Sequence, residues 1–235
     1  MDKDSRLKST LVPQLVSLTG WLEVYSDLYV QLVRNPAGIG FPDQESLETI
    51  THCIQETIRI GDLDQVIREH LQWNIWRSWQ AFSDKLCSNA MSYIPLLIDI
   101  DNEEHNLEGA YSLTQDCLDW FESTNQYSDS DHLRVVFSGM KGFHIEARPT
   151  QALDNRIVRK DLLLGLKEMG HNDRGASNRF LNGTIDPGHD FVRITGSFNS
   201  LKEDNALRRR KVIQFSLDDF RRLHIEDILE SSQAG

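Results

Sequence analysis

The chain has 235 residues, 39% of them hydrophobic, which is enough to bury a core as one large domain or one domain with a sizeable appendage. No apolar run approaches the roughly 20 residues of a membrane helix, and the first residues contain no apolar signal region. The three cysteines lack zinc-ligand spacing and are too far apart to indicate a disulfide framework. We therefore expect an intracellular protein without a membrane partner.

The net charge of -11 is unevenly distributed along the chain. Residues 1–130 carry 8 Lys and Arg against 21 Asp and Glu, whereas residues 131–235 carry 17 against 15. An acidic surface repels phosphate, so we expect the first half to face solvent or a protein partner. A basic face can form in the second half.

Apolar spacing predicts three helices in the first ninety residues, over 11–34, 44–60 and 63–86. The third would carry Trp73, Trp76 and Trp79 as a stripe at spacing three. Helix core is the favoured interpretation of this stripe, and a base-stacking platform is the alternative.

From residue 93 the apolar pattern changes to a mixture of strands and helices. Strands are predicted over 93–101, 133–137, 143–147, 184–186, 191–194 and 212–215, and helices over 107–123, 156–169 and 217–230. Ser216 with Asp219 is typical of the N-terminal cap of the last helix. The predicted fold class is α+β, with a helical segment over 1–90 and a mixed unit over 91–235.

The segment Leu96-Leu97-Ile98-Asp99-Ile100-Asp101 reads as a buried strand with two carboxylates near its end. Strand side chains alternate between faces, so Asp99 and Asp101 are expected to share one face. Two adjacent acids repel unless a cation lies between them, and Mg²⁺ or Mn²⁺ suits carboxylate oxygens. The alternative is a strand end with two solvated acids.

The loop Ser138-Gly139-Met140-Lys141-Gly142 is typical of a phosphate cradle. Its glycines let backbone N–H groups approach an anion, and Lys141 and Ser138 add a charge and a hydroxyl donor. His144 follows on the next strand. The alternative is an ordinary hairpin loop.

A further acid, Asp186, is followed seven residues later by Arg193 on a predicted strand. Arg193 could bind an anion or pair with Asp186 for structure. Asp190 competes with Asp186 as the third acid, and Asp186 is preferred. The basic run at 208–211 could follow a nucleic-acid backbone or form a solvated loop.

Together these segments resemble the archaeo-eukaryotic primase superfamily over about residues 90 to 216. Its members carry an Asp-x-Asp strand, a Ser-Gly-x-x-Gly-aromatic-His loop, and a strand-borne Asp before a basic residue and a small-residue turn. The corresponding residues here are Asp99 and Asp101; Ser138, Gly139, Lys141, Gly142, Phe143 and His144; then Asp186, Arg193 and Ser197. Archaeal members often have His where Asn199 stands.

The resemblance implies an RRM-like mixed sheet with flanking helices and a template-dependent nucleotidyltransferase. Asp99, Asp101 and Asp186 would hold two Mg²⁺ or Mn²⁺ ions, and Ser138, Gly139, Lys141, Gly142, His144, Arg193 and Ser197 would bind an NTP or dNTP. The expected partner is a single-stranded DNA template, and no zinc site is predicted. The alternatives are a catalytic subunit that needs a large subunit or helicase docked on the acidic half, a degenerate binding module without turnover, and a metal-dependent nuclease.

Overall fold

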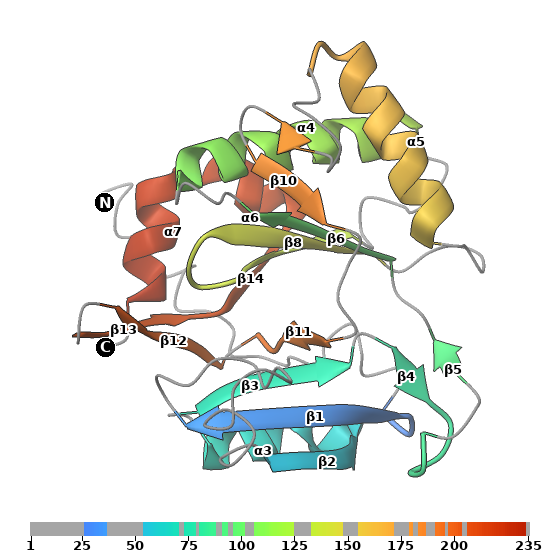
Figure 1. Ribbon diagram of the computed structural model, residues 1–235, viewed down its shortest axis with the longest axis vertical. Coiled ribbons are helices and arrows are strands. Elements are labelled where there is room, and N and C mark those ends of the chain that lie inside the picture. The colour runs from blue at the N-terminus through green and yellow to red at the C-terminus, as the bar shows by residue number, and fades with distance from the viewer. Residues whose placement is uncertain are drawn as a thin grey trace, which may run out of the picture. The chain divides into compact units, whose positions relative to one another are not determined.

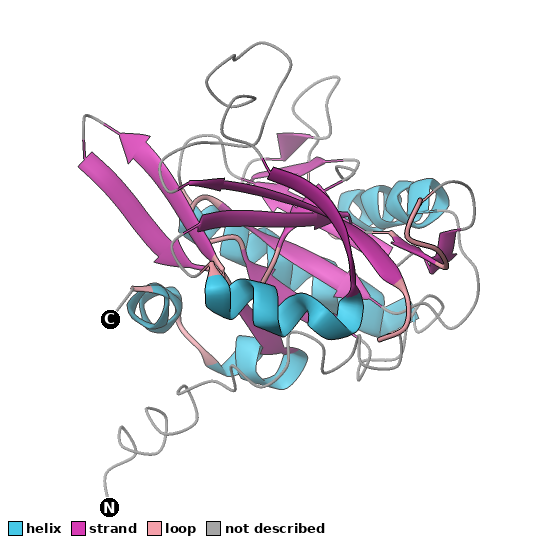
Figure 2. Cartoon of the chain, turned by 90° about the horizontal axis from the view of Figure 1, so that it is seen from below, coloured by secondary structure: helices cyan, strands magenta, loops and turns pink. Residues whose placement is uncertain are grey.

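The computed structural model shows a mixed α+β protein with two large antiparallel sheets and several helices (Figure 1). Figure 2 shows the strands of the chain in magenta and its helices in cyan. The structure describes residues 26–36, 54–70, 73–78, 80–87, 91–93, 96–101, 106–124, 133–147, 155–171, 179–180, 183–186, 191–195, 197–203 and 206–233.

The chain divides into two compact units. The first contains the described parts of residues 1–93 together with 192–211 and Gln233, and the second contains those of 94–191 and 212–232. The expected division into 1–90 and 91–235 stays a prediction. What the sequence did not indicate is that residues 192–211 would join the first unit.

The first unit is built around strand β1 (Tyr29–Pro36), which pairs antiparallel with its neighbours. The other strands of this sheet are β2 (Ile54–Arg59), β3 (Trp73–Ser78), β4 (Ala81–Phe82), β5 (Met91–Tyr93) and β11 (Phe191–Arg193). A short 3₁₀ turn, η2 (Ile60–Asp62), leads into helix α3 (Leu63–Glu69). Val30 and Leu32 pack with Leu63 and Ile67 of α3 and with Ile194 in a buried core.

The three helices predicted for the first ninety residues are wrong where the structure describes them. Tyr29–Pro36 and Ile54–Arg59 are strands, and only Leu63–Glu69 of the third segment is helical. Strand β1 pairs with other strands on both sides and has buried residues on both faces, so its sequence lacks the alternation of a half-buried strand.

The tryptophan stripe does not exist, because Trp73 and Trp76 lie on strand β3. Residues three apart on a strand point to opposite faces. Trp73 packs against the core with α3, and Trp76 is buried on the other face. Trp79 lies outside the described residues.

The first unit also contains a two-stranded ribbon made of β12 (Phe198–Glu203) and β13 (Ala206–Lys211). The two strands pair antiparallel over their whole length, from Phe198 opposite Lys211 to Glu203 opposite Ala206. The basic run at 208–211 therefore lies on a strand, and its interpretation as a loop is wrong.

The second unit contains a six-stranded sheet in the order β14-β7-β8-β6-β10-β9. Its strands are β6 (Leu96–Asp101), β7 (Leu133–Phe137), β8 (Gly142–Ala147), β9 (Arg179–Phe180), β10 (Gly183–Asp186) and β14 (Ile213–Ser216). Helices α4 (Leu107–Thr124) and α5 (Asn155–Glu168) pack against each other and against β6. These elements confirm the helices and most of the strands predicted for this region.

One face of this sheet is apolar and packs against helices. Ile98 and Ile100 of β6 and Phe143 and Ile145 of β8 are completely buried on it. The ring of Phe143 lies 6.1 Å from that of Tyr111 on α4, which identifies this face as the helix-covered one. Residues that are paired directly across an antiparallel ladder share a face. The polar residues of β6 and β8 therefore lie together on the opposite face of the sheet.

The predicted last helix is divided into α6 (Leu217–Arg222) and α7 (Ile225–Ser232). The break occurs at Leu223, whose backbone is extended, with φ −88° and ψ 145°. Leu223 is buried, and its carbonyl accepts a hydrogen bond from Tyr111 Oη at 2.7 Å. The predicted cap is confirmed, because the Asp219 backbone N–H donates to Ser216 Oγ at 3.2 Å.

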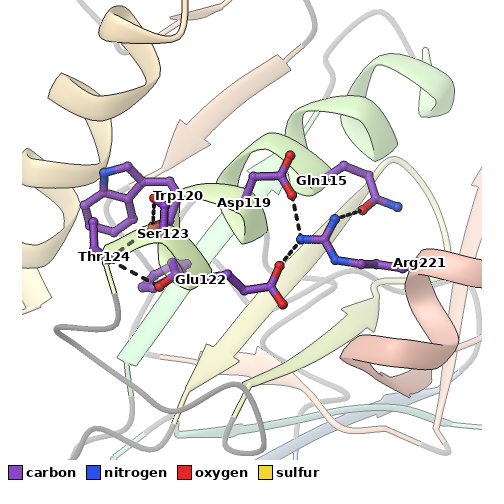
Figure 3. A network of polar contacts seen from close by, with 8 residues as sticks. Gln115, Asp119, Trp120, Glu122, Ser123, Thr124 and Arg221 are labelled. Carbon is purple, nitrogen blue, oxygen red and sulfur yellow. Dashed lines mark hydrogen bonds and ion pairs between the residues drawn. The ribbon is translucent and has the colours of Figure 1, made fainter.

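Arg221 joins α6 to α4 through three polar side chains (Figure 3). Its guanidinium donates to Asp119 at 2.6 Å, to Gln115 at 3.1 Å and to Glu122. Burial lowers the pKa of Arg221, but hydrogen bonding and charge from Asp119, and then from Glu122, outweigh it and raise the pKa overall. Arg221 is therefore a fixed cation that links two helices.

Replacing Arg221 by Gln should lower the free energy of unfolding by about 1 kcal/mol, because a partly exposed network contributes more than one isolated pair. That corresponds to a fall of roughly 2–4 °C in melting temperature for a chain of this size. Arg222→Gln is the matched control, because Arg222 is the exposed neighbour on the same helix. Equal melting temperatures for the two variants would contradict the role of the network.

Within the described part of the chain, no helix is both long and apolar enough to cross a membrane.

Candidate active site

The two carboxylates predicted to share a face do so. Strand β6 alternates, with Ile98 and Ile100 completely buried on the helix-covered face and Asp99 and Asp101 on the polar face. Asp99 is 8% exposed, and Asp101 is half-buried. Buried acids need a compensating positive charge, and a lysine in the loop before the neighbouring strand provides one for Asp101.

His144 and Lys141 are the neighbouring groups that contact these acids. His144 lies directly opposite Asp99 in the ladder, with Nε2 at 3.3 Å from Asp99 Oδ1. Lys141, in the loop before β8, places Nζ at 2.7 Å from Asp101 Oδ2. The loop and strand predicted to bind triphosphate are therefore next to the predicted metal ligands, and each acid has a side-chain nitrogen beside it.

The loop that carries Lys141 is closed by Ser138. The Ser138 backbone N–H donates to the carbonyl oxygen of Gly142 at 3.1 Å, and the Ser138 hydroxyl donates to the same oxygen at 3.0 Å. Gly139 has φ 88°, a conformation that favours glycine. Ser138 and Gly139 therefore shape the loop, and the Ser138 hydroxyl, predicted as a phosphate donor, makes a hydrogen bond within it.

Gly142 is required by the close approach of β8 to β6. It lies directly opposite Asp101, and a Cβ there would collide with the carbonyl oxygen of Ile100 and with the Asp101 carboxylate. A side chain at this position would force the two strands apart. The glycine therefore sets the distance between the acid pair and the loop.

Asp186 occupies the register position on β10 directly opposite Asp99. Thr184 is likewise opposite Asp101, so β10 flanks β6 on the side away from β8. This ladder puts the three predicted acids on one face of adjacent strands. The side chain of Asp186 and the competing Asp190 lie outside what the structure describes.

Glu146 and Arg134 belong to the polar face of this sheet but to none of the predicted motifs. Glu146 is 4% exposed and lies opposite Arg134 of β7, on the same face as His144. The alternation Gly-x-His-x-Glu along Gly142–Ala147, with apolar residues between, is the signal that could have identified this polar row.

Arg193 and Ser197 belong to the first unit. The Arg193 guanidinium lies 4.5 Å from the centre of the Trp76 ring and donates to Asn74 Oδ1 at 3.4 Å. Ser197 is buried, and its hydroxyl donates to the carbonyl of Ile194 at 2.5 Å. Arg193 is thus held by a cation–π contact and a hydrogen bond within its own unit.

Among the described side chains, no group of three His, Cys, Asp or Glu residues has the arrangement of a metal site. The predicted third ligand, Asp186, is not one of those side chains.

The chain matches no protein-family model, and a search of curated proteins finds no match. The candidate site therefore depends on the residues and their geometry.

Proposed function

We propose that the chain is a template-dependent nucleotidyltransferase of the primase-polymerase type. The observation that carries this proposal is the polar face of the second sheet, where Asp99 and Asp101 lie together with His144 and Lys141 beside them. Phosphoryl transfer needs carboxylates for divalent ions and cations for a triphosphate in one place.

The order of elements in the second unit supports an RRM-like fold. The chain runs β6-α4-β7-β8-α5 and then, after the short edge strand β9, continues into β10, and the four longer strands lie in the order β7-β8-β6-β10. This is a β-α-β-β-α-β arrangement with both helices on the apolar face. The polar face is then the one that bears the acids.

The donor set fits Mg²⁺ or Mn²⁺. Asp99, Asp101 and Asp186 would provide the hard oxygen ligands that these ions prefer. Bound divalent ions would stabilise the charge that develops on the transferred phosphoryl group. Lys141 pairs with Asp101 at 2.7 Å, so we expect it to turn toward the triphosphate when the acids take up cations.

Nucleotide binding without turnover is the second candidate. The specific observation in its favour is that both acids already have nitrogen neighbours, Lys141 and His144. An extension assay separates the two functions. It uses primed and unprimed single-stranded DNA, ribo- or deoxyribonucleotides, and Mg²⁺ or Mn²⁺. Template-dependent products support the polymerase, and nucleotide binding without product in every combination would overturn it.

Replacing Lys141 by Ala should weaken nucleotide binding roughly ten- to a hundredfold, because a charge-assisted contact contributes about 1.5–3 kcal/mol. The melting temperature should change little, since Lys141 is 45% exposed and exposed ion pairs contribute little to stability. Lys160→Ala is the control, because Lys160 is an exposed lysine on α5 of the same unit. Nucleotide titrations that give equal affinities for both variants would exclude Lys141 as a phosphate ligand.

A further inference from the structure

The ribbon β12–β13 differs in charge from the rest of the chain. Residues 198–211 contain five Lys and Arg against two Asp and Glu, within a protein of net charge -11. Four of the basic residues are consecutive, Arg208 to Lys211, and all four lie on β13. A positive segment in an acidic chain is a candidate contact for a polyanion.

The register of the ribbon assigns these four residues to both of its faces. Arg208 lies opposite Leu201 and Arg210 opposite Asn199, while Arg209 and Lys211 lie opposite Ser200 and Phe198. Successive residues of a strand alternate, so 208 and 210 share one face and 209 and 211 share the other. Residues on one face are about 6.6 Å apart along the strand.

The ribbon is a positively charged surface of the kind that follows the backbone of a single strand. Its contacts to phosphate carry no sequence information, which suits an enzyme that must accept any template. We propose that the ribbon at 198–211 is the surface that binds the sugar–phosphate backbone of the single-stranded template. This inference rests on the proposed polymerase function, and its test uses binding alone.

The same charges could instead protect a strand edge from pairing with other chains, a known use of Lys and Arg. β13 pairs with β12 on one side, and on the other Arg210 forms a single bridge with Gln233. Edge protection requires charge on the strand but no contact with a polyanion, so the two roles differ in salt-dependent binding.

The test measures binding of a fluorescent single-stranded oligonucleotide by anisotropy, without nucleotide or metal, over a range of salt concentrations. Two double variants divide the ribbon by face, Arg208→Gln with Arg210→Gln and Arg209→Gln with Lys211→Gln. The control, Lys85→Gln with Lys160→Gln, removes two exposed charges elsewhere. All three keep a polar side chain at each changed position.

At least one ribbon variant should bind about tenfold more weakly than the control, and its salt slope should fall by about 1.4, or roughly 0.7 for each lost phosphate contact. The face that gives the larger loss is the one that contacts the template. Wild-type affinity and slope in both ribbon variants, or an equal loss in the control, would overturn the proposal.

Failure of this inference can be distinguished from failure of the proposed function. Asp101→Asn, which should strongly impair incorporation, should keep the affinity and salt slope of the wild type for the oligonucleotide. If the ribbon variants bind normally while the wild type still incorporates nucleotide, the ribbon proposal alone is wrong. If the wild type does not incorporate nucleotide but the ribbon variants lose binding, the ribbon binds nucleic acid in a protein of another function.

Discussion

Replacing Asp101 by asparagine is expected to reduce nucleotide incorporation about a thousandfold or more. Asn keeps the shape of Asp but removes the charge that a divalent ion requires, and metal-derived charge stabilisation contributes several kcal/mol to such a transition state. The same result is expected for Asp99→Asn. The measurement is single-turnover extension of a primed template at saturating Mg²⁺ or Mn²⁺.

Loss of folding would not explain this result. Removing one of two neighbouring acids relieves repulsion between them, and the lost pair with Lys141 is partly exposed. The melting temperature without metal should therefore stay close to that of the wild type. Glu230→Gln, which removes an exposed acid on α7, is the control for the change in net charge. Incorporation by either site variant at the rate of this control would refute the assignment.

Replacing Gly142 by alanine should damage both stability and activity. The new Cβ would collide with the Ile100 carbonyl and the Asp101 carboxylate, so β8 must move away from β6. Overpacking of this kind costs about 3 kcal/mol, or roughly 6–12 °C in melting temperature. A shift of about 1 Å at a reacting centre can lower the rate about a hundredfold. Thermal melting and extension well below the melting temperature measure the two effects.

Gly165→Ala separates these two effects. Its Cβ would collide with the indole ring of Trp120 at the contact of α5 with α4, on the apolar side of the sheet. This variant should also lose stability, but it should incorporate nucleotide at nearly the wild-type rate. If both alanine variants lost the same activity, the loss would reflect general destabilisation, and Gly142 would have no particular role in setting the site.

The second unit could be predicted largely from sequence because its sheet has one polar and one apolar face. Each strand of the hairpin β7–β8 is short and bounded by polar or glycine residues, and α4 has an apolar stripe that includes Leu113 and Cys117. Local pattern and final environment agree there. The break at Leu223 was missed, because a buried leucine fits a helical pattern as well as an extended link.

The first unit was misread because its central strands are buried on both faces. Trp73–Ser78 is almost wholly buried, and Val30, Leu32 and Val33 of β1 are buried on alternate faces. With apolar residues on both faces, neither the period of a helix nor that of a strand is distinct. Whether such a segment forms a strand or a helix is then decided by its pairing partners, which are distant in sequence.

In the candidate site, too, contacts that depend on tertiary pairing could not be predicted. Asp99, Asp101, Lys141 and His144 could be placed together, because strand alternation and one hairpin relate them. The contact of Arg193 with Trp76 could not, because it joins residues 117 positions apart through tertiary pairing. The role of Ser138 in closing its own loop depends on the backbone geometry of four residues, which the motif does not specify.

The interleaving of the two units along the chain has a consequence for synthesis on the ribosome. Residues 1–93 cannot complete their own sheet, because β11 comes from Phe191–Arg193 and Ile194 both fills the core and donates its N–H to the Ile75 carbonyl at 3.1 Å. A nascent chain that stops between 94 and 190 would leave β3 without this neighbour, and unfinished strand edges promote aggregation. We therefore expect fragments that end between residues 94 and 190 to fold less completely and to aggregate more than the full chain. Rapid elongation through the second unit should favour correct folding of the first.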